Sequence, residues 1–217
     1  ATFLLGISLG SLFFRFLPRN ISKIYFYIIV QILIIISVLI SSLYFDELPL
    51  YYLYLREMFF DTWSDLNYIR FFLAGGMILL PTLAMGILFP IVCELISLEN
   101  KNMSHVVGKT YALNSFGAMF GAIFAGLFVI PFIGLQYTIY VGVLLNIIAL
   151  LIVLLESSKF SKLKKSIFLV FIILFYLSFI LSAQKWSAKI MSSGVSTYAD
   201  NYFKVSNKYK ELSLLDN

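Results

Sequence analysis

Long apolar runs separated by short polar stretches dominate this sequence. The longest, Thr110 to Leu155, extends over 46 residues without an Asp, Glu, Lys or Arg. One crossing of the ~30 Å hydrocarbon core of a bilayer takes roughly 20 helical residues. This run is therefore long enough for two membrane-spanning helices, and its length exceeds what the core of a soluble protein requires.

The complete pattern predicts an all-α membrane protein, a polytopic bundle of about six transmembrane helices with a short C-terminal polar tail. The expected spans are residues 1–17, 24–45, 71–93, 111–130, 136–155 and 166–183. An amphipathic, aromatic-rich segment at 48–60 suits the headgroup depth of a bilayer. Residues 1–184 would form the bundle, and residues 185–217 a short polar tail.

Composition narrows the chemistry available to the chain. It is 61% hydrophobic and 12% charged, whereas an ordinary soluble domain is about 25% charged. A single cysteine, Cys93, excludes an internal disulfide and a cysteine-based zinc site. Because His105 is the only histidine, we expect it on a surface loop rather than in a catalytic or metal cluster. We predict no catalytic, cofactor-binding or metal-binding residue here, and the chain begins as if inside a longer polypeptide.

The net charge of +5 comes from basic residues between the apolar runs. Nine fall on one side of the expected topology: Arg15, Arg19, Lys23, Lys101, Lys109, Lys159, Lys162, Lys164 and Lys165. In the loops between spans, only Arg56 and Arg70 fall on the other side. The excess of positive charge in cytoplasmic loops makes the first side cytoplasmic and the tail extracytoplasmic. These residues determine topology rather than bind nucleic acid, because they do not form a patch that follows phosphates.

Small residues and prolines are placed where helices could approach or bend. Gly6, Ser8, Gly10 and Ser11 in the first span suit close helix contact. In the third span, Pro81, Gly86 and Pro90 predict a kinked helix. Neighbouring helices in a bundle can satisfy the carbonyls that proline frees.

The fourth span carries a face of small and polar residues. Steps of three and four residues place on it Gly108, Tyr111, Asn114, Gly117, Gly121 and Ala125. Tyr111 and Asn114 could line a binding site. The preferred interpretation is a helix-packing seam, in which glycines let two backbones approach and Asn114 forms an interhelical hydrogen bond.

Few other polar residues lie within the spans. Glu94 is at the end of the third span, where either a solvated helix end or a proton or ligand site would explain it; we favour the solvated end. Gln31 and Asn146 are isolated in the second and fifth spans, and we expect each to form a helix–helix hydrogen bond rather than to line a channel.

Four segments carry a family resemblance. LLPTLAMGILFP (79–90), followed by GKTYALNSFGAMFGAIFAGLFVIPFIG (108–134), resembles the membrane domain of spermidine-synthase-like (polyamine aminopropyltransferase-like) integral membrane proteins of prokaryotes. FLLGISLGSLFFRFLPR (3–19) is similar to the small-residue span and basic loop early in that domain, and WSAKIMSSGVSTYA (186–199) resembles the segment that joins its last span to a catalytic domain. The resemblance covers nearly the whole chain in order. It departs at Ser187, where Asp is expected, and at Ser196–Thr197, where Tyr-Arg is usual.

The resemblance implies a Rossmann-like catalytic domain after the membrane part and a location in a prokaryotic inner (cytoplasmic) membrane. Such a domain transfers the aminopropyl group of decarboxylated S-adenosylmethionine to an amine such as putrescine. The glycine-rich turn it needs is missing here, since the tail has only Gly194. The cofactor therefore enters by resemblance alone. It is a cytoplasmic metabolite, whereas the charge count places the tail outside.

Three functions follow from these features. The first is a membrane-anchoring and oligomerisation domain of a spermidine-synthase-like protein, non-catalytic in itself. Its partners would be the lipid bilayer and other membrane subunits or further copies of the chain. The second is a transporter-like half, since Gly and Pro interrupt transporter helices. The third is a structural subunit of a larger membrane complex.

Overall fold

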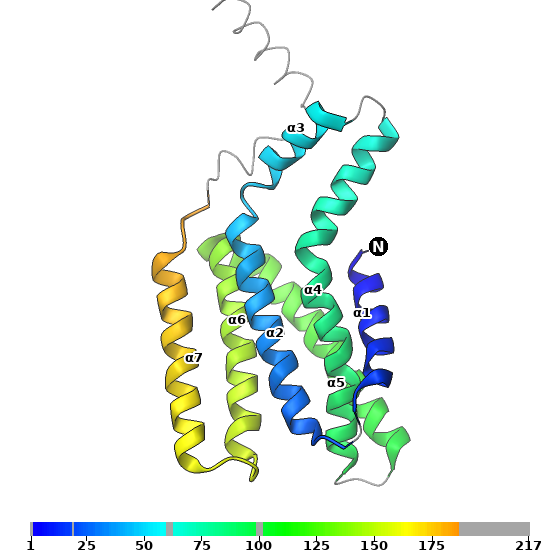
Figure 1. Cartoon of the computed structure of the whole chain (residues 1–217), viewed down its shortest axis with the longest axis vertical. Coiled ribbons are helices and arrows are strands. Elements are labelled where there is room, and N and C mark those ends of the chain that lie inside the picture. Colours follow the sequence, from blue (N-terminus) through cyan, green and yellow to red (C-terminus); the bar gives the residue numbers. More distant parts are fainter. Residues whose placement is uncertain (1, 19, 60–62, 99–101, 187–217) are drawn as a thin grey trace, which may run out of the picture. The chain divides into compact units, whose positions relative to one another are not determined.

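The computed structural model of the chain describes residues 2–18, 20–59, 63–98 and 102–186. These residues form helices and no strand, which confirms the predicted all-α fold. The elements, shown in Figure 1, are α1 (Thr2–Phe13) with a 3-10 continuation η1 (Phe14–Phe16), α2 (Lys23–Tyr44), α3 (Leu48–Phe59), α4 (Trp63–Ser97), α5 (Met103–Phe124), the π-helical η2 (Ala125–Val129), α6 (Ile130–Glu156) and α7 (Lys162–Ser182).

The chain divides into two compact units, a division the sequence did not suggest. The larger unit comprises Ala1–Ser42 and Ile78–Gln184, and the smaller comprises Leu43–Met77 and Lys185–Asn217. The larger unit therefore holds α1, nearly all of α2, the second half of α4 and the helices α5 to α7. Most of the predicted tail, residues 187–217, lies outside the described residues.

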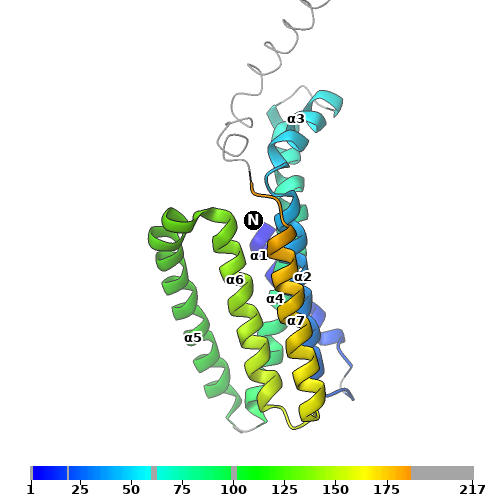
Figure 2. The ribbon, with the colours of Figure 1, turned by 90° about the vertical axis from the view of Figure 1, so that its left-hand side faces the viewer.

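Four segments are long and apolar enough to cross a membrane: Lys23–Tyr44, Asn67–Ser97, Met103–Glu156 and Lys162–Ser182. The third contains α5 and α6, which are two antiparallel arms (Figure 2). The chain turns between the two arms at Gly134, near the start of α6, where a φ of 82° and a ψ of 167° interrupt the helix at the predicted turn. Such a φ suits glycine because it has no Cβ. α1 is a shorter apolar helix of 12 residues.

Several helices begin earlier than the apolar runs predicted, and the difference is largest for α4 and α5. α4 starts at Trp63 rather than at residue 71, and α5 starts at Met103 rather than at residue 111. Hydrophobicity marks the part of a helix that crosses lipid, and the backbone stays helical into the polar region beyond. Asn102 caps α5, its side chain accepting a hydrogen bond from the His105 N–H at 3.3 Å. His105 is exposed as expected, but it lies in the first turn of a helix and not in a loop.

The core of the larger unit lies where α2, α4, α6 and α7 meet. The buried residues of α6 recur at steps of three and four, the spacing of a continuous helix seam. They are Tyr140, Val143, Ile147, Leu150 and Leu154. Ile34, Ile35 and Leu39 of α2 are almost fully enclosed in the same cluster. Shape-filling contact of this kind holds helices together in lipid, where burial of apolar surface supplies no drive between them.

The described part of the smaller unit is organised around Tyr52 of α3. Tyr52 and Ile69 are buried together. The Arg70 guanidinium lies 5.5 Å from the centre of the Tyr52 ring, and its Nη2 donates to the Tyr52 hydroxyl at 3.4 Å. In the same helix, the Tyr51 hydroxyl donates to the Glu47 carboxylate at 2.8 Å, a bond that raises the pKa of Tyr51 above its ordinary value.

α4 continues as one helix through Pro81 and Pro90. Proline removes an N–H from the helix ladder and leaves a carbonyl without its usual donor. Beside Pro81, the Thr82 hydroxyl donates to the carbonyls of Ile78 at 2.7 Å and Leu79 at 2.9 Å. A side chain of the same helix thus supplies additional hydrogen bonds to carbonyls in the turn that contains the first proline.

Among the described glycines of the larger unit, those of α1 and α4 lie at the closest contact between two helices. A Cβ on Gly10 would overlap the Leu83 carbonyl, and one on Gly86 would overlap the Ile7 backbone. Gly6 faces Thr82 in the same way. The close contact expected from the first span is therefore confirmed at Gly6 and Gly10, whereas Ser8 and Ser11 are exposed. Gly86, predicted as a kink position, has a packing role here.

We predict that Gly86→Ala destabilises the protein by roughly 1–3 kcal/mol, because the new methyl group meets backbone that cannot rotate away. Gly76→Ala in the same helix is the matched control, since open space surrounds that glycine. It should be neutral or slightly stabilising through helix propensity. Thermal unfolding in detergent measures both, and equal midpoints would show that the α1–α4 contact is not tight.

Candidate functional site

The polar side chains of the larger unit are the candidates for chemistry, because ionisable and amide groups within spans are expensive. At the end formed by the start of α2 and the end of α4, Lys23 Nζ lies 3.4 Å from Glu94 Oε2. The side chains are 12% and 35% exposed, respectively. Nζ also lies 5.5 Å from the ring centre of Phe14 and 5.9 Å from that of Phe26.

This arrangement changes the interpretation of Glu94. The carboxylate is a partly exposed helix-end group, as we favoured, but it also pairs with Lys23 from another helix. The Lys23 amine thus has a carboxylate and two aromatic rings near it, each of which attracts a cation. The Lys23–Glu94 pair therefore joins α2 to α4 and does not form an open ligand site.

Gln31 occupies the middle of the bundle and is 2% exposed. Its Nε2 lies 3.5 Å from the carbonyl oxygen of Asn146 on α6, the outer limit of a hydrogen bond. Its Oε1 is buried and accepts no hydrogen bond from a described residue. The expected helix–helix bond of Gln31 is thus present but weak.

Asn146 behaves differently from the expectation. Its Nδ2 donates to the Gly142 carbonyl of its own helix at 3.0 Å. Its link to α2 runs through its backbone carbonyl rather than its side chain. One turn away, the Tyr27 hydroxyl donates to the Ala149 carbonyl at 3.4 Å. α2 is therefore attached to α6 by two long hydrogen bonds to backbone.

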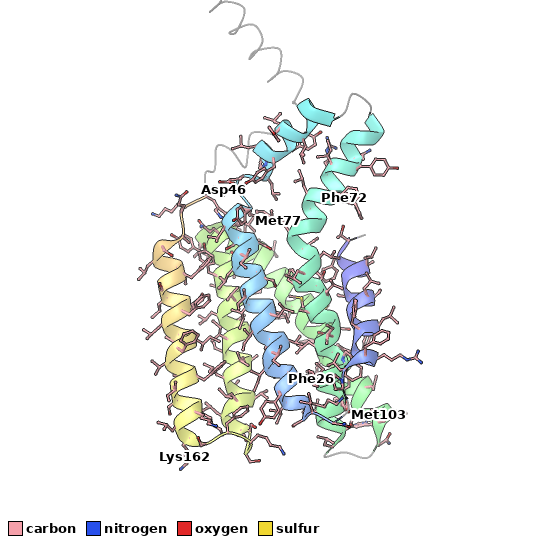
Figure 3. The ribbon with its side chains drawn as sticks, viewed as in Figure 1. Phe26, Asp46, Phe72, Met77, Met103 and Lys162 are labelled. Carbon is pink, nitrogen blue, oxygen red and sulfur yellow. The ribbon has the colours of Figure 1, made fainter. Side chains whose placement is uncertain are left out.

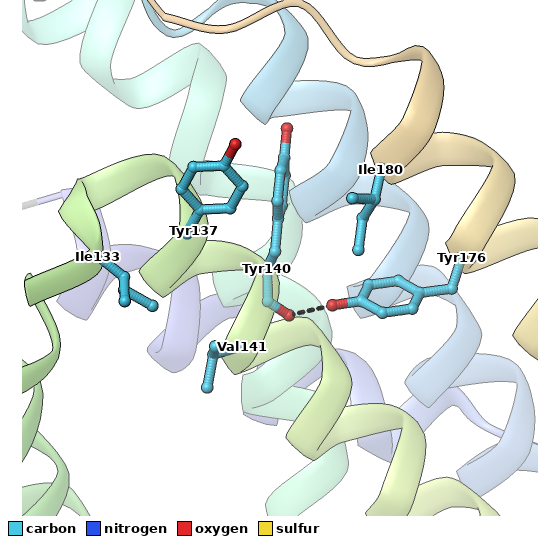
Figure 4. Close-up of a pocket in the computed structure, with 6 residues that line it drawn as sticks. All are labelled: Ile133, Tyr137, Tyr140, Val141, Tyr176 and Ile180. Atoms are coloured by element: carbon cyan, nitrogen blue, oxygen red, sulfur yellow. Dashed lines mark hydrogen bonds between the residues drawn. The ribbon is translucent and has the colours of Figure 1, made fainter.

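A stronger bond joins α6 to α7. The Tyr176 hydroxyl donates to the Tyr140 carbonyl at 2.7 Å (Figure 4). The Gln136 amide donates to the Tyr140 hydroxyl at 3.0 Å and to the Gln184 carbonyl at 2.7 Å. These bonds hold α6 and the end of α7 together, at the end opposite the lysine-rich connection between the two helices.

Beside this network lies a shallow pocket of about 450 Å³. Its lining, drawn in Figure 4, consists of Ile133, Tyr137, Tyr140, Val141, Tyr176 and Ile180. None of these side chains is an acid, a base or a nucleophile at neutral pH, so the pocket suits apolar groups. The sequence alone does not indicate this pocket, because tyrosines near a span end are also typical of an ordinary aromatic belt.

The predicted packing seam lies on α5, and it faces open space. No described atom comes within 4 Å of where a Cβ would stand on Gly108, Gly117 or Gly121, neighbouring atoms of their own helix apart. Tyr111 is 65% exposed, Asn114 is exposed and Ala125 is half-buried. Within α5 only Val106 is buried. The seam therefore stays a prediction, and it concerns a partner other than the described helices of the same chain.

The described residues bring together no group of His, Cys, Asp and Glu that could hold a metal ion. The chain matches no protein-family model, and comparison with curated proteins and with solved structures found no match. The spermidine-synthase-like resemblance therefore stays a prediction, and function has to be argued from the geometry.

The interhelical hydrogen bonds lead to a prediction that compares two variants. Tyr176→Phe should lower stability by about 0.6–1.7 kcal/mol, the range of hydrogen bonds between membrane helices. Gln31→Leu should be neutral or stabilising by up to ~1 kcal/mol, because it removes a buried amide whose oxygen is unsatisfied. Thermal unfolding in the same detergent compares the two variants. A greater loss for Gln31→Leu would mean that this amide makes a stronger bond than the geometry indicates.

Proposed function

We propose that this chain is the membrane-anchoring and oligomerisation domain of a spermidine-synthase-like integral membrane protein and is itself non-catalytic. Its long apolar helices would hold the polypeptide in the bilayer. A surface on α5 would join it to another copy. The observation that carries this proposal is that α5, although long enough to span, packs against almost nothing in the part of the chain that the structure describes.

The distribution of side-chain size on α5 supports a protein partner. Large apolar residues occupy one side of the helix, among them Phe116, Phe120 and Phe124, with the rings of Phe120 and Phe124 stacked at 5.9 Å. The other side carries Asn114 and Gly121 together with several alanines. The side with large residues suits disordered lipid chains. The side with small residues, here called the smooth side, lets the backbone of another helix approach.

Asn114 adds the second argument. Its amide lies on the exposed smooth side, and it forms no hydrogen bond within the described part of the chain. Hydrocarbon offers no hydrogen-bond partner. An asparagine both donates and accepts, so two copies related by a two-fold axis can satisfy each other at this position. We therefore propose self-association through α5.

The remaining parts of the proposal rest on sequence. The resemblance supports an aminopropyltransferase-like domain following the tail, and decarboxylated S-adenosylmethionine would bind there and not within the bundle. The nine-to-two distribution of basic residues in the loops between spans supports an extracytoplasmic tail, and the resemblance supports a prokaryotic inner membrane. The starts of α2, α5 and α7 and the end of α6, which adjoin the basic loops counted as cytoplasmic, lie at one end of the larger unit (Figure 1).

Oligomerisation is tested by Gly121→Leu on α5 and Gly142→Leu on α6. Open space surrounds both glycines in one copy, so both variants should fold. Gly121→Leu should weaken self-association at least about tenfold, or ~1.4 kcal/mol, because it separates the paired backbones. Gly142→Leu should not. Light scattering of the purified chain in mild detergent and in nanodiscs measures the association. A monomeric wild type, or identical behaviour of the two variants, would rule out the α5 interface.

Orientation is tested separately by Ser192→Cys in a Cys93→Ser background. An extracytoplasmic tail should react with a membrane-impermeant maleimide added to intact cells. Lys162→Cys in the same background is the control and should react only after permeabilisation. The reverse pattern would place the tail in the cytoplasm and restore access to the cytoplasmic cofactor.

A further inference from the structure

The connection from α6 to α7 concentrates positive charge at one end of the larger unit. Lys159, Lys162 and Lys164 are exposed. Lys165 is half-buried, and its ammonium group donates to the Leu155 carbonyl at 2.6 Å. Between Leu155 and Phe168 the sequence has a single carboxylate, Glu156. Figure 3 shows Lys162 at the same end of the unit as Phe26 and Met103, where the spans end.

An apolar groove begins about one turn from these lysines. It has a volume of about 200 Å³ and lies between α2 and α7. Its lining is entirely apolar: Ile32, Ile35, Ile36, Phe168, Phe171, Ile172 and Phe175. Phe171 is 69% exposed and Ile36 is 40% exposed, so the groove opens on the lipid-facing surface.

The connection between α6 and α7 adjoins both helices that form the groove. The Tyr25 ring of α2 meets the Phe160 ring of the loop edge to face, with centres 5.3 Å apart. Phe168 follows Lys164 by four residues, or about 6 Å along the helix. From Phe168 to Phe175 the groove extends for about another 10 Å. This order, charge at the span end and an apolar channel deeper in the membrane, matches a molecule with an anionic head and a hydrocarbon chain.

We propose that this surface binds an anionic phospholipid of the cytoplasmic leaflet. Its phosphate lies among Lys159, Lys162 and Lys164, and one acyl chain lies in the groove between α2 and α7. The lysines select the head group by charge. The groove adds close packing rather than hydrophobic drive, because the bilayer around it is equally apolar. This site is independent of the α5 surface and of any catalytic domain, and only its assignment to the cytoplasmic leaflet rests on the orientation proposed above.

Two variants separate the two halves of the site. Lys162→Gln with Lys164→Gln removes two exposed charges, and each lysine near a membrane surface contributes about fivefold to the affinity for an anionic lipid. Lys109→Gln, an exposed lysine on α5, is the matched control for charge. Ile36→Trp fills the groove, and Ile148→Trp, at a similarly exposed position on α6, is the matched control for size.

The test uses the purified, delipidated chain in detergent. Native mass spectrometry with dioleoyl-phosphatidylglycerol and dioleoyl-phosphatidylcholine measures binding of two lipids that share the same chains. Phosphatidylglycerol should bind more tightly. The affinity of the double lysine variant should fall about 25-fold for phosphatidylglycerol and little for phosphatidylcholine. The affinity of Ile36→Trp should fall a few-fold for both lipids. Lys109→Gln and Ile148→Trp should match the wild type.

Three results would overturn the proposal. Equal affinity for the two lipids would remove the charge selection. An unchanged affinity in the double lysine variant would place the lipid elsewhere. Inorganic phosphate that competes equally well with the lipid, together with no effect of Ile36→Trp, would reduce the surface to a phosphate site without a role for the groove.

Discussion

The absence of hydrogen-bond partners in hydrocarbon is the constraint on which this structure depends. Helices satisfy the hydrogen-bonding groups of the backbone. Polar side chains must therefore donate to backbone carbonyls that already accept a hydrogen bond. Most return to their own helix: Ser37 donates to the Ile34 carbonyl, and Thr82 donates one turn back. Only a few reach another helix, and among them the Tyr176 bond is short. Because polar bonds between helices are so few, shape has to specify which helices pair.

The helices differ in how extensively they pack against one another. α6 places every third or fourth residue in the core against α2, so these helices would hold each other even without the long Gln31 bond. α5 follows the same chain but has a single buried residue, Val106. The turn at Gly134 lets α6 enter the core while α5 stays at its margin. A span attached by its ends alone presents its whole length to whatever lies beside it in the membrane.

The sequence predicted the fold well because each crossing needs an uninterrupted apolar run, and these runs are legible without a structure. It predicted helix ends poorly, since α4 begins at Trp63 among polar residues. Small residues were the ambiguous signal. Gly6 and Gly10 contact α4, whereas Gly117 and Gly121, with the same spacing, contact nothing described. Spacing shows that a helix can be approached closely, but the partner depends on tertiary arrangement. The pockets depend on that arrangement too, and no sequence motif predicted them.

The basic residues show how one sequence feature can carry several physical roles. All nine count equally toward topology, yet the structure distinguishes among the described ones. Lys23 is neutralised by Glu94, and Lys165 is engaged by the Leu155 carbonyl. The exposed lysines of the α6–α7 loop have no such partner among the described residues, and their charge therefore faces the headgroup region. A charge that has no protein partner at that depth is compensated by water, counterions or lipid phosphate. The adjoining apolar groove is what favours lipid phosphate over the other two.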